Sequence, residues 1–162
     1  MSDRPCIVAG TALAVAISAG APLVGVILLG PSGIGKTETA LRWIEACPFG
    51  RSALISDDQV TLRASAQGLS ASPPPSLAGR AEIRGTSIVS LPYRQNMPLH
   101  LALRLVTTVE RRLPDPARWQ PLGPMAPDLP LFPWRVGAAG LRLFLGSEIR
   151  KGLDNPAGHR SK

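Results

Sequence analysis

The feature that most constrains the fold is a glycine-rich motif near the start of the chain. Residues 30–37 read G-P-S-G-I-G-K-T and match the phosphate-loop pattern G-x-x-x-x-G-K-[ST]. An apolar run at residues 24–29 precedes the motif, and a helix-like stretch at residues 37–46 follows it. Because this motif joins a buried strand to a helix in the proteins that use it, the sequence predicts an α/β fold built around a phosphate-binding loop.

The motif also predicts the ligand. Its glycines allow successive backbone N–H groups to point inward at phosphate oxygens, and the helix that follows aims its positive dipole end at them. Lys36 can reach the β and γ phosphates, and the Thr37 hydroxyl suits Mg²⁺. We therefore expect ATP to contact the whole loop: Gly30, Pro31, Ser32, Gly33, Ile34, Gly35, Lys36 and Thr37. A glycine-rich turn that binds no ligand is the alternative.

Composition indicates one globular domain over residues 1–153, followed by a flexible basic tail at 154–162. Hydrophobic residues make up 44% of the chain, which excludes a disordered protein, whereas the 4% of aromatic residues argues against a surface for single-stranded nucleic acid. The net charge of +7 fits an acidic partner or a phosphorylated ligand, or else an ordinary solvated surface. Cys6 and Cys47 have no metal-site or disulfide spacing and fit a reduced, cytoplasmic protein.

One stretch invites a different interpretation. No charged residue lies between Arg4 and Lys36, and residues 5–29 are long enough to cross a bilayer or to act as an export signal. However, three glycines and Pro22 interrupt the stretch, and its last part runs directly into the phosphate loop. Two buried strands joined by a turn at residues 18–22 are the better explanation, so we expect no membrane association.

The rest of the chain predicts a mixed sheet with few helices. Residues 67–76 and 114–133 are expected to be loops because glycine, serine and proline dominate them, with a short edge strand at 129–132. His100 belongs to a strand with one exposed face and is not expected to act as a base. The strands are expected at residues 6–9, 11–17, 24–29, 52–56, 59–63, 81–84, 87–91 and 99–106, and the helices at 37–46 and 138–153.

Two further groups of residues suggest chemistry next to the loop. Asp57 and Asp58 end a short apolar strand, where one carboxylate can hold Mg²⁺ and the other can act as a general base on an acceptor hydroxyl. Glu82 and Arg84 share one face of an extended segment, offering a carboxylate for metal and a guanidinium for phosphate oxygens. A solvated turn and a surface ion pair are the corresponding alternatives.

These three motifs in this order resemble the C-terminal domain of the HPr kinase/phosphorylase family. The matching segments read G-P-S-G-I-G-K-T-E-T-A-L at 30–41, L-I-S-D-D-Q-V at 54–60 and A-E-I-R-G-T-S-I at 81–88. The resemblance implies a compact α/β fold similar to phosphoenolpyruvate carboxykinase. It also implies ATP- and Mg²⁺-dependent phosphorylation of a serine on the phosphocarrier HPr. The chain looks like a short form without the amino-terminal domain of longer members, which assemble as hexamers.

The resemblance assigns roles position by position. Lys36 would bind the transferring phosphate, and Asp58 would accept the proton of the acceptor serine. Arg84 would belong to the loop shared by the forward and reverse reactions. The metal ligands would be Thr37, Asp57 and Glu82.

Two departures from the family pattern bear most on the activity. The chain has Ala9-Gly10-Thr11 where the family usually has a histidine, and only Arg135 echoes the family's late arginine loop. Kinase activity is therefore more strongly implied than the reverse, phosphorolytic activity. Two other functions remain open: a nucleotide-binding regulatory module without turnover, and a small-molecule kinase.

Overall fold

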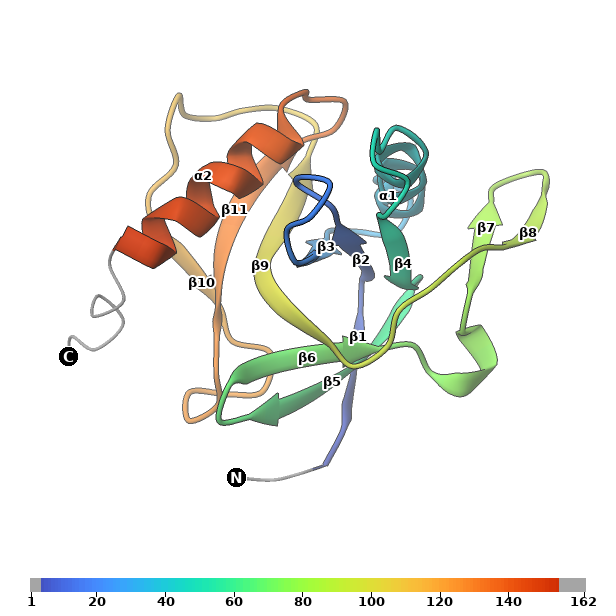
Figure 1. Ribbon diagram of the computed structural model, residues 1–162, viewed down its shortest axis with the longest axis horizontal. Helices are drawn as coiled ribbons and strands as arrows, with labels where there is room; N and C mark the ends of the chain where they lie inside the picture. The colour runs from blue at the N-terminus through green and yellow to red at the C-terminus, as the bar shows by residue number, and fades with distance from the viewer. Residues whose placement is uncertain (1–3, 155–162) are drawn as a thin grey trace.

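The computed structural model describes residues 4–154, which form one mixed sheet, one projecting hairpin and two α-helices (Figure 1). The helices are α1, Lys36–Glu45, and α2, Leu141–Asp154, and a short 3₁₀ turn covers Pro75–Leu77. The strands are β1 Cys6–Ala9, β2 Thr11–Val15, β3 Val24–Leu29, β4 Ala53–Ser56, β5 Gln59–Ser65, β6 Gly68–Ser72, β7 Arg80–Ile83, β8 Ser87–Ser90, β9 Met97–Val106, β10 Ala117–Trp119 and β11 Leu129–Arg135. The basic tail predicted at 154–162 lies outside the described residues, apart from Asp154, which ends α2.

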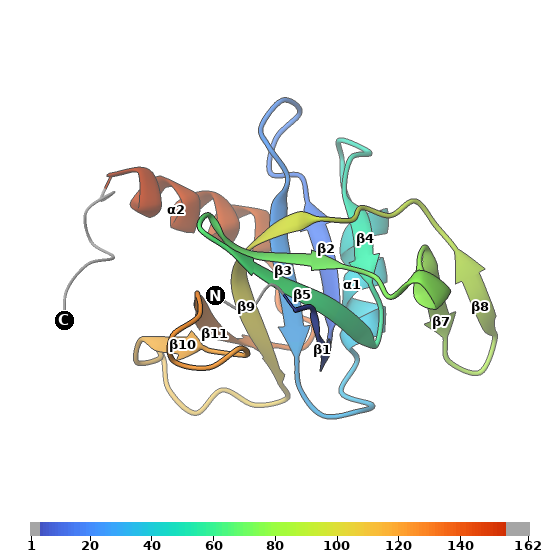
Figure 2. The ribbon, with the colours of Figure 1, turned by 90° about the horizontal axis from the view of Figure 1, so that it is seen from below.

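The sheet is mixed, and its parallel part sets the position of the phosphate loop. Strand order is β1-β5-β6-β9-β3-β2-β4, with β11 pairing on β9 and β10 pairing on β11. Strands β3, β9 and β11 are parallel, so their carboxyl ends lie at one edge (Figure 2). The phosphate loop leaves β3 at this edge, where open α/β sheets generally bind their ligands.

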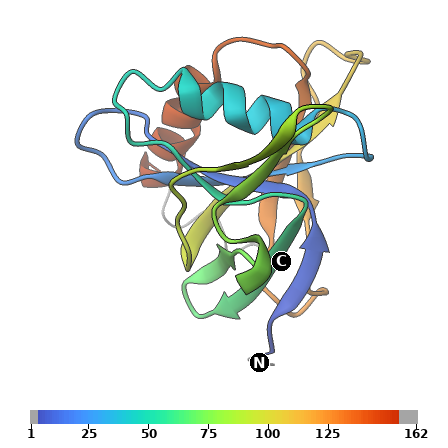
Figure 3. The same ribbon diagram turned by 90° about the vertical axis from the view of Figure 1, so that its right-hand side faces the viewer.

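Both faces of the central strands are buried, and this explains their continuous apolar sequence. On one face, Val26 and Leu28 of β3 pack in a cluster with Ala40 of α1 and Leu145 of α2. Figure 3 shows both helices on this side. On the other face, Ile27 joins a second cluster, which includes residues of β5 and β6 as the sheet curls over. The predicted class, α/β with a compact mixed sheet and few helices, is confirmed.

Residues 5–29 form the strands β1, β2 and β3, as predicted. The Arg51 guanidinium fixes the turn between β2 and β3 by donating hydrogen bonds to the carbonyl oxygens of Ser18, Ala19 and Ala21 at 2.8–3.0 Å. Within residues 4–154, neither helix has the length and apolar character needed to cross a bilayer.

The loop predicted at residues 67–76 is wrong, because β6 occupies Gly68–Ser72. Leu69 and Ala71 alternate with more exposed neighbours and are buried in the core, while the strand pairs with β5 and β9. The composition did not reveal this alternation of buried and more exposed residues, because small residues are also common in loops. The stiff Pro73–Pro75 stretch does stay outside the sheet, as expected.

The proline-rich segment at 114–133 contains more structure than predicted. Strand β11 extends to Arg135 and carries Pro130 and Pro133. Pro130 pairs only with β10, and Pro133 only with β9, so each proline has one side free of ladder bonds. This is the arrangement in which a sheet tolerates a residue without an N–H group.

Strand β9 is also more buried than predicted. Leu101, Ala102 and Leu103 are all buried because β9 runs between β3 and β11, although His100 and Arg104 remain exposed. The tryptophans serve packing: the Trp134 ring meets Trp43 of α1 and Phe144 of α2, each with centroids 5.7 Å apart. These contacts hold the end of β11 against both helices.

Candidate functional site

The phosphate loop has the backbone geometry its sequence predicts. Gly33 and Gly35 have φ values of +84° and +105°, a region that other residues rarely adopt. Gly35 is the N-cap of α1 and has no side chain with which to bond the first helical amides. These amides, together with the helix dipole, provide positive potential for an anion at the start of α1.

The Lys36 side chain is hydrogen-bonded to the first residues of its own loop. Its Nζ donates hydrogen bonds to the carbonyl oxygens of Gly30 at 2.7 Å and Pro31 at 3.1 Å. An ammonium group has three donors, so the third N–H can serve an anion in the cavity. The lysine charge is thereby held at the loop rather than free to move on a flexible side chain.

Asp57 is a buried carboxylate with several hydrogen-bond donors around it. The hydroxyls of Thr11 and Thr37 donate to its Oδ1 at 2.9 and 2.7 Å, and the backbone N–H of Glu82 lies 3.4 Å from its Oδ2. Asp57 is only 7% exposed. A buried carboxylate persists only where such donors compensate for its lost hydration, so this group is held in one orientation.

Asp58 adopts an unusual backbone conformation beside Asp57. Its φ is +67°, and the Gln59 N–H donates to the Asp57 carbonyl at 2.8 Å, which closes a γ-turn centred on Asp58. The Asp58 carbonyl is in turn held by the Gly10 N–H at 3.0 Å. Strained residues of this kind are concentrated at functional sites, and here the turn leaves the Asp58 side chain exposed at the cavity wall.

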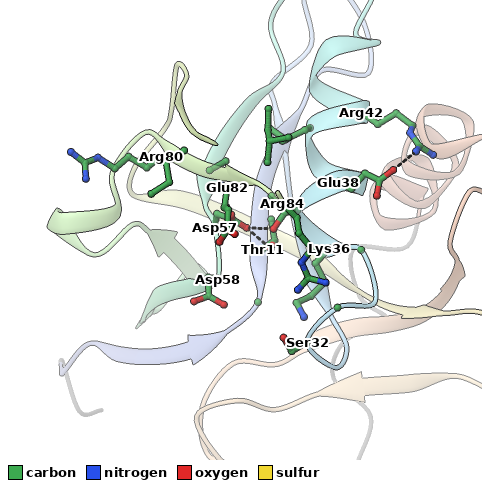
Figure 4. A pocket seen from close by; sticks show the side chains of 18 of the residues that line it. Thr11, Ser32, Lys36, Glu38, Arg42, Asp57, Asp58, Arg80, Glu82 and Arg84 are labelled. Carbon is green, nitrogen blue, oxygen red and sulfur yellow. Dashed lines mark hydrogen bonds and ion pairs between the residues drawn. The ribbon is translucent and has the colours of Figure 1, made fainter. Parts of the chain in front are cut away.

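The hairpin of β7 and β8 supplies the remaining predicted residues. The predicted Glu82 and Arg84 alternate along β7 and its extension with Arg80, which the sequence analysis did not single out, and all three line the cavity. The Arg84 guanidinium lies beside the phosphate loop, since an added Cβ at Gly33 would be 3.5 Å from its nitrogen. In Figure 4 the Arg84 side chain points towards Lys36, whereas the Arg80 side chain points away from it.

These elements surround one surface cavity of about 890 Å³. It is lined by the phosphate loop, by the outer surface of α1, by both aspartates and by the hairpin. The predicted residues that line it are Gly30, Ser32, Gly33, Gly35, Lys36, Thr37, Asp57, Asp58, Glu82 and Arg84.

Two residues of the motif have other positions. Ile34 packs against the helix-side core, and Pro31 contributes its carbonyl to the loop, accepting from Lys36. Arg135, suggested as a late catalytic arginine, is exposed at the end of β11 and is not among the residues lining the cavity.

Hard oxygen donors are available for a magnesium ion. Asp57 and Thr37 are already adjacent, and the Glu82 backbone is next to Asp57. Within residues 4–154, no three His, Cys, Asp or Glu side chains are grouped as a metal-binding cluster. Mg²⁺ typically takes one or two protein carboxylates and completes its shell with phosphate oxygens and water.

Sequence reasoning missed Gly10 and Thr11 as site residues. Both line the cavity, and each holds one member of the aspartate pair. The sequence signal that could have indicated them is their position in the segment where the family usually has a histidine. Their role depends on strand pairing that brings together residues far apart in sequence. Thr11 and Asp57, for example, are 46 positions apart, and no local pattern reveals their contact.

Comparison with known proteins agrees with this geometry. Residues 17–96 match the family model described as HPr Serine kinase C-terminal domain. An HPr kinase/phosphorylase from Clostridium botulinum (strain Eklund 17B / Type B) is 40% identical over 68 residues, and one from Clostridium tetani (strain Massachusetts / E88) is 36% identical over 86 residues. These alignments cover 42% and 53% of this chain but only 21% and 27% of the relatives.

A solved structure extends the likeness to the fold of nearly the whole chain. The HPr(Ser) kinase/phosphatase from Coxiella burnetii superposes with a TM-score of 0.68 over 90% of this chain and 95% of that one, at 21% identity. At this identity, the likeness shows a shared fold. The predicted resemblance to the HPr serine kinase C-terminal domain is therefore confirmed for residues 17–96.

Proposed function

We propose that this protein is an ATP- and Mg²⁺-dependent kinase that phosphorylates a serine of the phosphocarrier HPr. The observation that carries this proposal is the convergence of four side chains from two segments on one cavity: Lys36 and Thr37 from the loop, and the Asp57–Asp58 pair. Phosphoryl transfer needs phosphate binding, charge neutralisation and a proton acceptor. These four side chains provide a candidate for each requirement.

The phosphate end of the cavity is positively charged. Backbone N–H groups at the start of α1, the Lys36 ammonium and the Arg84 guanidinium would hold the β and γ phosphates. Because Lys36 is tied to the loop carbonyls, its charge is already in place when a nucleotide binds. Such preorganised charge stabilises the transition state without reorganisation.

Thr37, Asp57 and Glu82 would hold Mg²⁺ beside these phosphates. Bound there, Mg²⁺ would neutralise charge on the transferring group. Asp57 suits this role because its burial and its Thr11 and Thr37 partners fix the carboxylate. Glu82 is exposed and only its backbone is placed against Asp57, so it would complete the site when the metal and nucleotide are present.

Asp58 would act as the general base. In the proposed reaction, the acceptor serine Oγ forms a bond to the γ phosphorus, the bond from phosphorus to the ADP oxygen breaks, and Asp58 takes the serine proton. Asp58 is suited to this because its side chain is exposed at the cavity while the γ-turn fixes its backbone.

HPr is proposed as the acceptor because the relatives are named for it. The net charge of +7 is compatible with an acidic partner. We also extend to this chain the homo-oligomeric assembly that the resemblance implies and the cytoplasmic location that Cys6 and Cys47 indicate.

The decisive experiment is a transfer assay with purified protein, labelled ATP, Mg²⁺ and HPr. We expect label on HPr and none on an HPr variant whose acceptor serine is replaced by alanine. Label that persists on the serine-free HPr would overturn the serine assignment, and absence of any transfer would overturn the kinase. Adding phosphate or pyrophosphate to phosphorylated HPr tests the reverse reaction in the same assay.

A nucleotide-binding regulatory module is the second candidate. Two observations favour it: Ala9 lines the cavity where the family usually has histidine, and Arg135 does not line it. This function predicts ATP binding by calorimetry without transfer to HPr. Transfer to HPr at rates typical of kinases would eliminate it.

A further inference from the structure

The aspartate pair lies where two bent strands cross. Strands β1 and β2 are separated only by Gly10, and strands β4 and β5 only by Asp57 and Asp58. Strand β1 pairs with β5 and strand β2 pairs with β4, both antiparallel, so the two bends face each other. At this crossing the Gly10 N–H donates to the Asp58 carbonyl, and the Thr11 hydroxyl donates to the Asp57 carboxylate.

The Thr11 side chain is buried, and its hydroxyl donates a hydrogen bond to Asp57. Thr11 is 1% exposed, and its Oγ1 lies 2.9 Å from Asp57 Oδ1. The carboxylate has no proton to give, so the hydroxyl is the donor. Since the strand pairing fixes the Thr11 backbone, the hydroxyl reaches Asp57 from a rigid part of the sheet.

Thr11 and Thr37 both donate to the same carboxylate oxygen. Two donors on Oδ1 restrict rotation of the carboxylate, and among residues 4–154 Oδ2 has only the long 3.4 Å contact to the Glu82 amide. Thr37 is itself a candidate metal ligand at the start of α1. Thr11 is therefore the donor whose only role towards the metal is to orient Asp57.

We propose that Thr11 is a positioning residue that aims Asp57 Oδ2 at the divalent cation. This inference rests on the proposed function, because it assumes that Asp57 is a metal ligand. Partners that orient a ligand typically affect metal affinity 10- to 100-fold when they are removed. If Thr11 only satisfied the hydrogen-bonding capacity of a buried carboxylate, its replacement would lower the free energy of unfolding and leave the cation affinity unchanged.

The test uses Mn²⁺ as the probe, with its binding to the full chain followed by electron paramagnetic resonance in the presence of ADP. We expect Thr11→Val, which keeps the shape and removes the hydroxyl, to weaken Mn²⁺ binding about 10-fold or more. Thr11→Ser restores the donor and should bind Mn²⁺ within about twofold of the parent. Thr61→Val, a half-buried threonine of β5 outside the cavity, is the matched control and should leave binding unchanged.

Unchanged Mn²⁺ affinity in folded Thr11→Val would overturn the proposal, as would equal weakening in Thr11→Ser. If Thr11→Val fails to fold, Thr11→Cys replaces it, because a thiol has similar size and is a weaker donor. Weakened binding in that variant supports the proposal, and parental binding overturns it.

Because this readout needs no acceptor protein, it is separate from the test of kinase function. A chain that binds Mn²⁺ with ADP but transfers nothing to HPr would refute the kinase and leave the Thr11 result standing. A parent chain that binds no Mn²⁺ with ADP would refute both.

Discussion

The phosphate loop and the aspartate corner, which consists of Gly10, Thr11, Asp57 and Asp58, line the same cavity but are built in different ways. The loop is one continuous segment, and its glycines, Lys36 and the start of α1 interact mainly with each other. The corner is assembled from strands far apart in sequence: Thr11 contacts Asp57, and Gly10 contacts Asp58. Anion binding can thus be encoded locally, whereas the orientation of the carboxylates depends on strand pairing.

This difference predicts that substitutions in the two regions fail differently. Changes in the loop should impair nucleotide binding and transfer together. Changes in the corner should impair metal use or proton transfer while nucleotide binding persists. The following variants test that division, in order of expected effect.

Asp58→Asn should have the largest effect on transfer. Removing a positioned general base lowers the rate by about 10²- to 10⁴-fold. Asparagine tolerates the φ of +67° and retains the backbone contacts of the γ-turn, so folding should be normal. Rates of transfer to HPr and ATP affinity by calorimetry measure the two properties. Parental transfer in this variant would show that Asp58 is not the base.

Lys36→Met should lower transfer by about 10²- to 10³-fold, by the removal of one preorganised charged donor. In contrast to Asp58→Asn, it should also weaken ATP binding in the same calorimetric titration. The two hydrogen bonds to Gly30 and Pro31 are lost with the charge, so circular dichroism must show that α1 remains folded. Unaltered ATP affinity would contradict local encoding of the phosphate site.

Gly33→Ala tests the loop backbone through stability. Alanine at a φ of +84° is strained by about 1–3 kcal/mol, so urea unfolding should show that loss. Gly20→Ala is the matched control, because a Cβ there meets nothing within 4 Å and its φ is outside the left-handed region. We expect the control to stay within about 0.5 kcal/mol of the parent. Equal stability of the two variants would mean that the loop is not held in this conformation.

His100 provides the smallest effect and lies at the start of β9, at the opposite end of that strand from the phosphate-loop edge. Although part of the His100 side chain is exposed, desolvation of its ring lowers its pKa below the ordinary 6.5, and its Nδ1 accepts a hydrogen bond from the Gly25 N–H. The folded state thus favours the neutral ring. Stability should be complete above pH 6.5 and decline as the pH falls through the folded-state pKa.

The His100 effect is measured by thermal unfolding between pH 4.5 and 8. His100→Asn, which keeps an acceptor and does not titrate, should have a flatter pH profile than the parent. An identical profile would assign the pH dependence to other groups. The comparison also separates the pH dependence of folding from that of Asp58 in the transfer assay.

Prediction from sequence succeeded where the signal was local or continuous. The apolar run of β3, the phosphate loop and α1 occur as predicted. A buried strand and an amphipathic helix can both be recognised from the pattern of apolar residues within one short segment. Strand β6 was missed because its small residues resemble a loop until Leu69 and Ala71 are seen in the core. The prolines of β11 likewise indicated a loop, because only the strand pairing shows that each proline has one side without ladder hydrogen bonds.

The sequence by itself determined the conformation of the phosphate loop, because a glycine-rich loop between a buried strand and a helix has little choice of geometry. It also indicated the carboxylates at 57, 58 and 82 and the guanidinium at 84. Only the tertiary structure decided how they are oriented. The pairing of β1 with β5 and of β2 with β4 brings Gly10 and Thr11 to the aspartates, and hydrogen bonds between residues 46 positions apart are not encoded by either segment alone.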